Sequence, residues 1–214
     1  MIGILCLLNV TALASPSGEQ NSDIKDRMIS HLNLSDVTLF VALNELSRYE
    51  HIPIGIELGS YHRASTDIKV KLEIKNSRLS DILDELVRQA PDYRWDLNDG
   101  VINFTPIQER DPFILKALNT RIVSFGPRRG MSRLQLRNAI TELPELDKLL
   151  KSNNISALNF GTSPDTIHFR LEVDLSIANT DLRGVLNNIV RKNDDKFWVI
   201  GWDGDTKDGI YINF

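Results

Sequence analysis

The four histidines are the side chains best suited to hold a metal ion, and their spacing predicts no metal site. They are His31, His51, His62 and His168. A metal site that can be recognised in a sequence places His or Cys ligands a few residues apart. No two of these histidines are that close, and the chain has 1 cysteine, Cys6, which is close to none of them. We therefore expect no metal ion and no other cofactor.

An acidic stretch near the C-terminus shares some features with a calcium-binding loop. It begins at Asp203 and Asp205, but its fifth and sixth positions are Lys207 and Asp208, where such a loop needs a ligand and a glycine. No glutamate closes it at position twelve. Because apolar segments flank the stretch, we interpret it as the turn of a hairpin.

The clearest candidate for binding an anion is a basic segment that precedes an apolar helical pattern. It runs from Gly126 through Arg128, Arg129 and Gly130 to Arg133. Arginines near the start of a helix attract phosphate or carboxylate groups. A KH loop, which binds nucleic acid, has two residues between its glycines, whereas three separate them here. Arg128, Arg129 and Arg133 are thus candidate anion-binding residues, and a solvated turn is the simpler alternative.

No catalytic motif is present in the sequence. It has no Gly-x-Ser-x-Gly nucleophile motif, no metalloprotease helix motif and no phosphate-binding loop. The formal net charge of −4 and the pI of about 5.6 argue against nucleic-acid binding through overall charge. The 29 acidic residues leave one enzymatic alternative, a hydrolase whose carboxylates converge in the fold. We therefore expect a protein that is not an enzyme.

The N-terminus predicts export from the cytoplasm. Ile2–Val10 is nearly all apolar, Ala12–Ala14 has the small residues of a cleavage site, and a polar stretch begins at Ser15. These features are typical of a signal peptide over residues 1–14, although no Lys or Arg precedes the apolar core. A poorly ordered apolar terminus is the alternative. Cleavage would remove Cys6, so we expect a cysteine-free periplasmic or secreted protein.

Two halves of the chain repeat one pattern of elements. Residues 39–46 and 136–143 place apolar side chains at helical spacing. Residues 68–74 and 167–173 alternate apolar and polar side chains, which predicts strands with one wet face. The wet-face charges are Lys69, Lys71, Glu73, Arg170 and Glu172. We expect these charges to discourage indiscriminate strand pairing and to select partners by sign.

A second helix and a hairpin follow in each half. Ser77 and Thr180 stand where these helices would need an N-cap. The hairpins are expected over 93–104 and 197–214, each with a Gly-containing acidic turn. The apolar stripes of the two helices are Leu79, Ile82, Leu83, Leu86 and Val87, and Leu182, Val185, Leu186, Ile189 and Val190.

These elements predict an α+β fold of two tandem related small modules, each with two helices packed on one face of a short mixed sheet. We place the first module at 27–106 and the second at 121–214. A disordered lead is expected over 15–26 and a linker over 107–120. Leading strands are expected at 28–34 and 121–125, an extra strand at 53–58, and a helical insertion after Pro144.

The apolar spacing of the first module carries a family resemblance through Leu39, Ala42, Leu43 and Leu46, then Val70, Leu72 and Ile74, then Leu79, Ile82, Leu83 and Leu86. With this spacing the first module resembles the secretin and TonB short N-terminal domain family over residues 30–105, and the second does so more weakly over 121–214. The resemblance implies a module that works by protein–protein contact in the bacterial envelope and has no catalytic residues. Because the sequence ends at Phe214, we expect stand-alone copies without a secretin or barrel domain.

The sequence therefore predicts a secreted or periplasmic non-enzymatic interaction protein. Its expected partner is another protein or a second copy, bound at an edge or wet face of a sheet. Nucleic acid and a transmembrane segment in the mature chain are not expected. The alternatives are a small envelope hydrolase using acidic residues between the modules, and an anion or nucleic-acid binder using the Arg128–Arg129 loop.

Overall fold

The computed structural model describes residues 24–58, 68–108, 110–157, 170–202 and 209–214. The first half runs through β1 (Met28–Thr38), α2 (Leu39–Glu50), β2 (Ile54–Glu57), β3 (Lys69–Arg78), α4 (Leu79–Gln89), β4 (Tyr93–Asn98) and β5 (Val101–Pro106). The second half runs through α5 (Pro112–Leu118), β6 (Arg121–Phe125), α6 (Arg133–Thr141), α7 (Pro144–Ser152), β7 (Ser156–Ala157), β8 (Ile177–Asp181), α8 (Leu182–Lys192), β9 (Phe197–Trp202) and β10 (Gly209–Asn213). This arrangement confirms the predicted α+β class.

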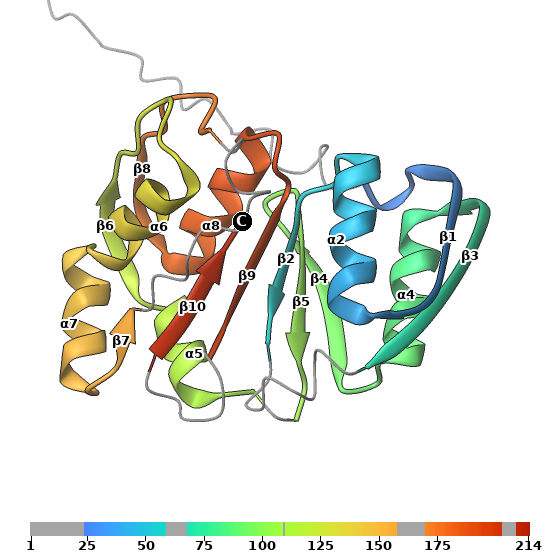
Figure 1. Ribbon diagram of the computed structural model, residues 1–214, viewed down its shortest axis with the longest axis horizontal. Helices are drawn as coiled ribbons and strands as arrows, with labels where there is room; N and C mark the ends of the chain where they lie inside the picture. Colours follow the sequence, from blue (N-terminus) through green and yellow to red (C-terminus); the bar gives the residue numbers. More distant parts are fainter. Residues whose placement is uncertain (1–23, 59–67, 109, 158–169, 203–208) are drawn as a thin grey trace, which may run out of the picture.

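The strands form one central sheet and two separate ribbons. The central sheet has the order β4-β5-β2-β9-β10-β7, and the ribbons are β1-β3 and β6-β8. Each half pairs its strands in the same way, with a hairpin (β4-β5 or β9-β10) and a parallel strand (β2 or β7) beside it. Parallel pairing of β2 with β9 joins the halves into one sheet. Figure 1 shows this sheet crossing the middle of the molecule.

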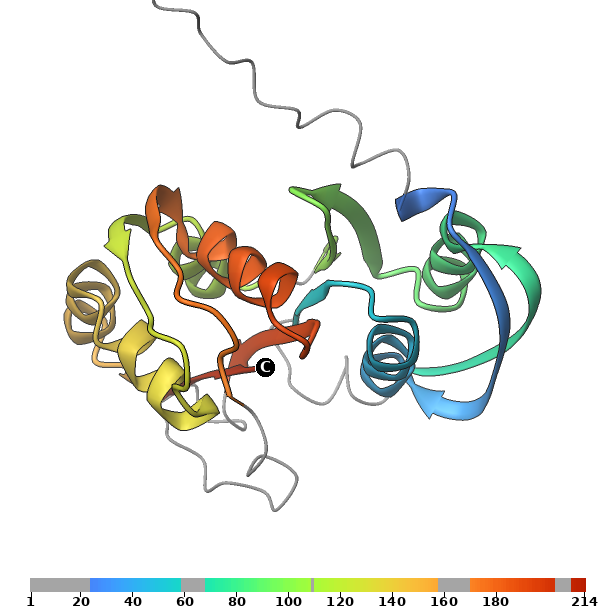
Figure 2. The same cartoon turned by 90° about the horizontal axis from the view of Figure 1, so that it is seen from above.

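Helices fill the space between each ribbon and the central sheet. In the first half α2 and α4 lie between the sheet and the ribbon β1-β3, as Figures 1 and 2 show. In the second half α6 and α8 occupy the corresponding place beside the ribbon β6-β8. The alternation of β3 explains its position, because Val70, Leu72 and Ile74 are buried against the helices while the intervening side chains are exposed.

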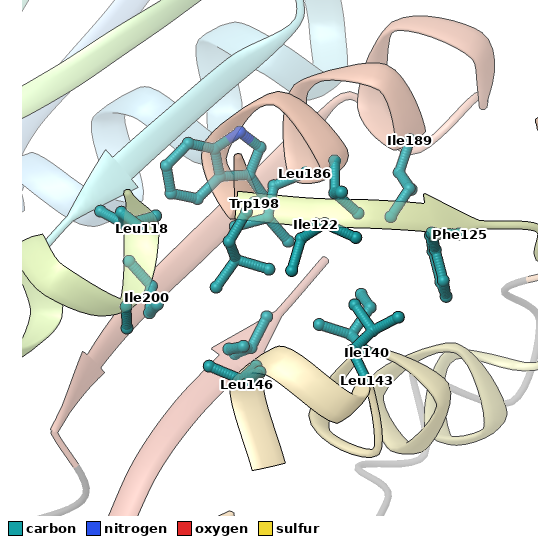
Figure 3. Close-up of a cluster of buried hydrophobic side chains, with 14 of the residues drawn as sticks. Leu118, Ile122, Phe125, Ile140, Leu143, Leu146, Leu186, Ile189, Trp198 and Ile200 are labelled. Atoms are coloured by element: carbon teal, nitrogen blue, oxygen red, sulfur yellow. The ribbon is translucent and has the colours of Figure 1, made fainter. Parts of the chain in front are cut away.

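The central strands are buried on both faces, so two cores form on opposite sides of β9. Phe197 and Val199 belong to the first core, with side chains of α2 and α4. Trp198 and Ile200 belong to the second core, with side chains of α5, β6, α6 and α8. Figure 3 shows these second-core side chains converging. Each fully buried aliphatic side chain there contributes about 1.5 to 3 kcal/mol through removal of apolar surface from water.

The same backbone bend precedes a helix four times. The residues Asp36, Asn76, Gly130 and Asn179 have positive φ angles of 56°, 49°, 86° and 54°. Each lies two residues before the N-cap residue of α2, α4, α6 or α8. Asn, Asp and Gly tolerate this left-handed conformation better than other residues do. The bend thus occurs twice in each half of the chain.

Three local predictions from the sequence are wrong. Ser77 and Thr180 are not N-caps, since the helices begin one residue later with Arg78 and Asp181 in the capping position. Asp181 accepts a hydrogen bond from the Gly184 N–H, whereas Arg78 makes no side-chain cap. Residues 170–173 form no strand beyond a bridge from Arg170 to Ser132. The strand that corresponds to β3 is β8, because β8 pairs with β6 and leads into α8 as β3 pairs with β1 and leads into α4.

Several boundaries are refined by the structure. Residues 24–26, at the end of the expected lead, form a helical turn, and the expected linker 107–120 contains α5. The signal peptide, most of the lead and residues 158–160 lie outside the described residues. None of the described helices has both the length and the apolar character needed to cross a membrane.

Candidate functional site

A hollow of about 730 Å³ lies between the two halves. One wall is α2, and the other is built from residues 170–172, the start of α6, the segment that precedes β9 with the first residues of β9, and the end of β10. Both aromatic and charged side chains line it. The lining residues are Phe40, Asn44, Ser47, Arg48, His51, Arg133, Arg170, Glu172, Asn193, Asp194, Asp195, Lys196, Phe197, Val199, Asn213 and Phe214.

Two of the basic side chains around the hollow already have partners. Arg133 donates from Nη2 to Asp195 Oδ2 over 3.2 Å, and its side chain is 14% exposed. The Lys196 ammonium donates to the Arg191 carbonyl, which closes the end of α8. Both contacts lie within the wall that the second half of the chain builds, and they reduce the positive charge that the hollow offers to an anion.

Glu172 and Asp194 form a pair of carboxyl groups at the hollow. A hydrogen bond between the two side chains raises the pKa of Glu172, and loss of hydration and repulsion from Asp194 act in the same direction. The Glu172 N–H donates to Asn193 Oδ1 over 3.1 Å, which holds the two segments together. Both side chains are exposed, however. Such a pair can share a proton, but it lacks the dry surroundings that favour acid–base catalysis.

The three arginines predicted to bind an anion lie at the start of α6 and on the turn that precedes it. Arg133 lines the hollow, whereas the side chains of Arg128 and Arg129 are exposed on the turn before α6 and do not line it. The Arg129 N–H donates to Asp174 Oδ1 over 2.8 Å. At the start of α6, Ser132 and Gln135 form a capping box that satisfies N–H groups an anion would otherwise use.

The two histidines that the structure describes lie far from any cluster of metal ligands. His51 caps the end of α2 in the left-handed conformation, and His31 is exposed on β1. In the part of the chain that is described, no group of three His, Cys, Asp or Glu side chains is placed to hold a metal ion. His62, His168 and the acidic stretch 203–208 lie outside that part.

The most deeply buried carboxylate holds the two halves together. Glu57, at the end of β2, is fully buried. Arg110 binds both of its oxygens over 2.8 Å, and Arg183 of α8 donates to Oε2 over 3.0 Å. Because every oxygen is occupied by a cation, Glu57 is a structural ion pair rather than a general base.

Side chains cover two of the sheet edges. On β3, the Gln89 amide donates to the Lys71 carbonyl over 2.8 Å and accepts from the Lys71 N–H over 2.7 Å. On β6, the Val123 N–H donates to Glu145 Oε1 over 3.1 Å. These amide and carboxylate groups take the place of a neighbouring strand, so they block pairing there.

The other ribbon strands are interrupted. β1 bulges at Asp36, where its register with β3 shifts, and Lys69 donates to the Asp36 carbonyl. β8 contains Asn179 with positive φ and is 5 residues long. Bulges and short length are the usual means by which proteins protect exposed edges.

Among the described residues, nothing protects the edge strand β4 in these ways. Its hairpin with β5 turns through Asp99 and Gly100, both with positive φ, and Asn98 pairs with Val101. In such a hairpin the N–H and C=O groups of alternate residues point away from the partner strand. On β4 these are the groups of Trp95 and Leu97, and within the described residues they have no hydrogen-bond partner.

The two faces of β4 carry different kinds of side chain. Arg94 and Asp96 are exposed on one face, where Arg94 also donates to the Thr105 hydroxyl over 3.3 Å. On the other face the Trp95 indole donates to Asp84 Oδ1 over 2.8 Å, and the Lys25 ammonium lies 5.4 Å from its ring centre. The contacts of Trp95 therefore hold the strand in place. A positive charge, Arg94, precedes Trp95 and a negative charge, Asp96, follows it.

Sequence reasoning missed this edge and the two side chains that cover other edges. The Asp-Gly turn predicted the hairpin, but the residues of β4 do not indicate whether another strand lies beside it in the sheet. Gln89 and Glu145 belong to helices, so their contacts with strands depend on tertiary packing. Comparison with known proteins finds no family model that matches the chain and no curated protein that it significantly resembles.

Proposed function

We propose that this protein is a non-enzymatic protein-interaction module of the bacterial envelope that binds an extended segment along β4. The open edge of β4 carries the proposal. Main-chain N–H and C=O groups of Trp95 and Leu97 can pair with an added strand, which supplies affinity without a deep pocket. The contrast with β3 and β6 supports it, since side chains cover those edges and leave β4 as the regular one.

The envelope location is supported by the sequence alone. The signal-like residues 1–14 favour export, and residues 30–105 resemble a family of interaction modules in the bacterial envelope. The recurrence of one strand-pairing pattern in both halves supports a duplicated module of this kind. Mass spectrometry of the protein recovered from its native envelope should give Ser15 as the first residue. Retention of Met1 in a cytoplasmic fraction would remove this part of the proposal.

A hydrolase is the second candidate, favoured by the Glu172–Asp194 pair at the hollow. A raised pKa is what a general acid requires. Both carboxyl groups are open to water, and Arg48, Arg133, Arg170 and Lys196 share the hollow with them. Two hydrated carboxyl groups among four basic side chains are typical of a charged protein surface rather than of a catalytic site. Catalysis is therefore the second candidate.

Site-specific crosslinking in the native envelope tests the proposal. A photoreactive amino acid in place of Asp96 should form an adduct with a protein, and one in place of Lys151 on α7 serves as the matched exposed control. The Leu97→Pro substitution removes an outward N–H from an edge position where proline is tolerated, so it should abolish the adduct at position 96. Thermal unfolding of that variant checks its fold.

The crosslinking result separates the two candidates. Adducts at position 96 that disappear with Leu97→Pro support strand addition at β4. Equal labelling at positions 96 and 151, or no adduct at either, contradicts it. Turnover of a glycan or peptide by the purified chain that is lost in Glu172→Gln would instead establish the hydrolase.

A further inference from the structure

We infer that the strand which β4 accepts is β4 of a second copy, in an antiparallel pair with Trp95 on the two-fold axis. The inference rests on the proposed function, because it uses the same open edge. It names the partner and the register. Two independent features of β4, the direction of its backbone groups and the order of its charges, select this arrangement.

The backbone selects which registers are possible. In an antiparallel pair, two opposed residues bond to each other only if both point their N–H and C=O groups toward the partner strand. Trp95 and Leu97 do so on β4, and the Tyr93 N–H points the same way but is bound by the Ala90 carbonyl. With Trp95 opposite Trp95 of the second copy, each backbone donates to the other. Leu97 of each copy then faces Tyr93 of the other.

The charges select one register among these. With Trp95 on the axis, Arg94 of each copy stands opposite Asp96 of the other, in non-hydrogen-bonded pairs, where opposed side chains approach most closely. Moving the axis to residue 94 opposes two arginines, and moving it to residue 96 opposes two aspartates. Like charges directly opposite one another are destabilising. Of these three registers, only the one centred on Trp95 places each Arg94 opposite an Asp96 of the other copy.

The two side chains are available for this pairing. Arg94 and Asp96 are exposed, and in the structure as described neither forms an ion pair with another residue. The interface is small, so we expect a reversible dimer with a dissociation constant on the order of micromolar. Because surface charges are screened, association should weaken as salt concentration rises.

A charge-swap experiment tests the register. Arg94→Asp places two aspartate pairs across the axis, and Asp96→Arg places two arginine pairs there. Each single variant should weaken dimerisation at least about tenfold, measured by analytical ultracentrifugation of the purified chain at several concentrations. The double variant Arg94→Asp/Asp96→Arg restores opposite charges across the axis, so its dissociation constant should return to within a few-fold of wild type. Lys151→Asp, an equal charge reversal on α7, should leave it unchanged.

Urea unfolding of each variant shows whether the fold is retained. A wild-type chain that stays monomeric at tens of micromolar overturns the inference, as does a folded double variant that remains monomeric. If the chain is monomeric while position 96 still crosslinks to a different protein, self-pairing fails and the proposed function stands. If position 96 crosslinks to nothing, both fail.

Discussion

The indole of Trp198 lies against Gly55, its partner across the β2–β9 junction. The two residues are paired in the parallel ladder that joins the halves. A Cβ atom on Gly55 would fall inside contact distance of three indole atoms, Cε2, Cζ2 and Nε1. The indole N–H donates to Asn187 Oδ1 of α8 over 2.8 Å, which fixes the ring in that place. The junction therefore needs a glycine on one strand and a large aromatic on the other.

Gly55→Ala should destabilise the protein by about 1 to 3 kcal/mol, because the buried indole has no space into which it can retreat. Urea unfolding measures the change in free energy. Gly126→Ala is the matched control, since the nearest atom to its new Cβ is the Leu175 carbonyl oxygen at 3.8 Å. That control should change stability by less than about 0.5 kcal/mol. Equal effects at both positions would show that the indole is not a rigid neighbour.

Glu57→Gln should cost about 3 to 5 kcal/mol, because it leaves two guanidinium groups beside a neutral amide at a buried site. The Glu57 side chain is 0% exposed and those of Arg110 and Arg183 are 25% and 12% exposed. The exposed pair Lys151–Asp147 provides the comparison, and Lys151→Ala should cost about 0.5 kcal/mol or less. Chemical denaturation would measure both. A small effect at Glu57 would mean that the halves do not depend on this ion pair.

The left-handed residues before the helices offer a test of the repeat. Asn76→Val and Asn179→Val should each cost about 1 to 2 kcal/mol, because a β-branched residue resists positive φ. Asn→Gly at the same positions should change stability little. Lys75→Val, an exposed strand position one residue away, controls for loss of a polar side chain. If valine is tolerated at one asparagine and not at the other, the two bends are not equivalent.

The sequence predicted elements better than it predicted their contacts. Period-2 and helical spacing located β3, α4 and α8, since one buried face imposes that spacing wherever an element lies. Of the strand expected at 167–173, the described residues 170–173 form only the bridge from Arg170 to Ser132, because β6 ends at Phe125, which the segment itself does not encode. The position of β4 at the edge of the sheet depends on its neighbours in the fold and not on its own residues, so it could not be predicted. For the same reason the Glu57 ion pair, made across 53 and 126 residues, could not be predicted.

The basic turn before α6 should be dispensable for folding. Arg128→Ser together with Arg129→Ser should change stability by less than about 0.5 kcal/mol, because the fixed contacts of this turn use backbone N–H groups rather than the guanidinium groups. Ser132→Ala, which breaks the capping box four residues along, should cost about 1 kcal/mol. Thermal unfolding distinguishes the two. Loss of phosphate binding in the folded double variant would revive the anion-binding alternative.

The Glu172–Asp194 pair should make stability fall as pH rises. The protonated Glu172 carboxyl donates a hydrogen bond to the Asp194 carboxylate, which raises the pKa of Glu172 in the folded state, so the folded protein holds this proton more tightly than the unfolded chain does. The stabilisation is therefore complete at low pH and is lost as pH rises from about 4 through the folded-state pKa. Glu172→Gln keeps a neutral donor toward Asp194, so this contribution should vanish.

The difference in unfolding free energy between Glu172→Gln and wild type, measured by urea denaturation across pH, isolates that contribution. It should shift in favour of the variant as pH rises, and Asp194→Asn should abolish the same trend because it removes the other member of the pair. Lys196 and Arg129 oppose the shift, so their removal should steepen it. A difference that stays flat with pH would mean that water at this exposed site separates the two carboxyl groups.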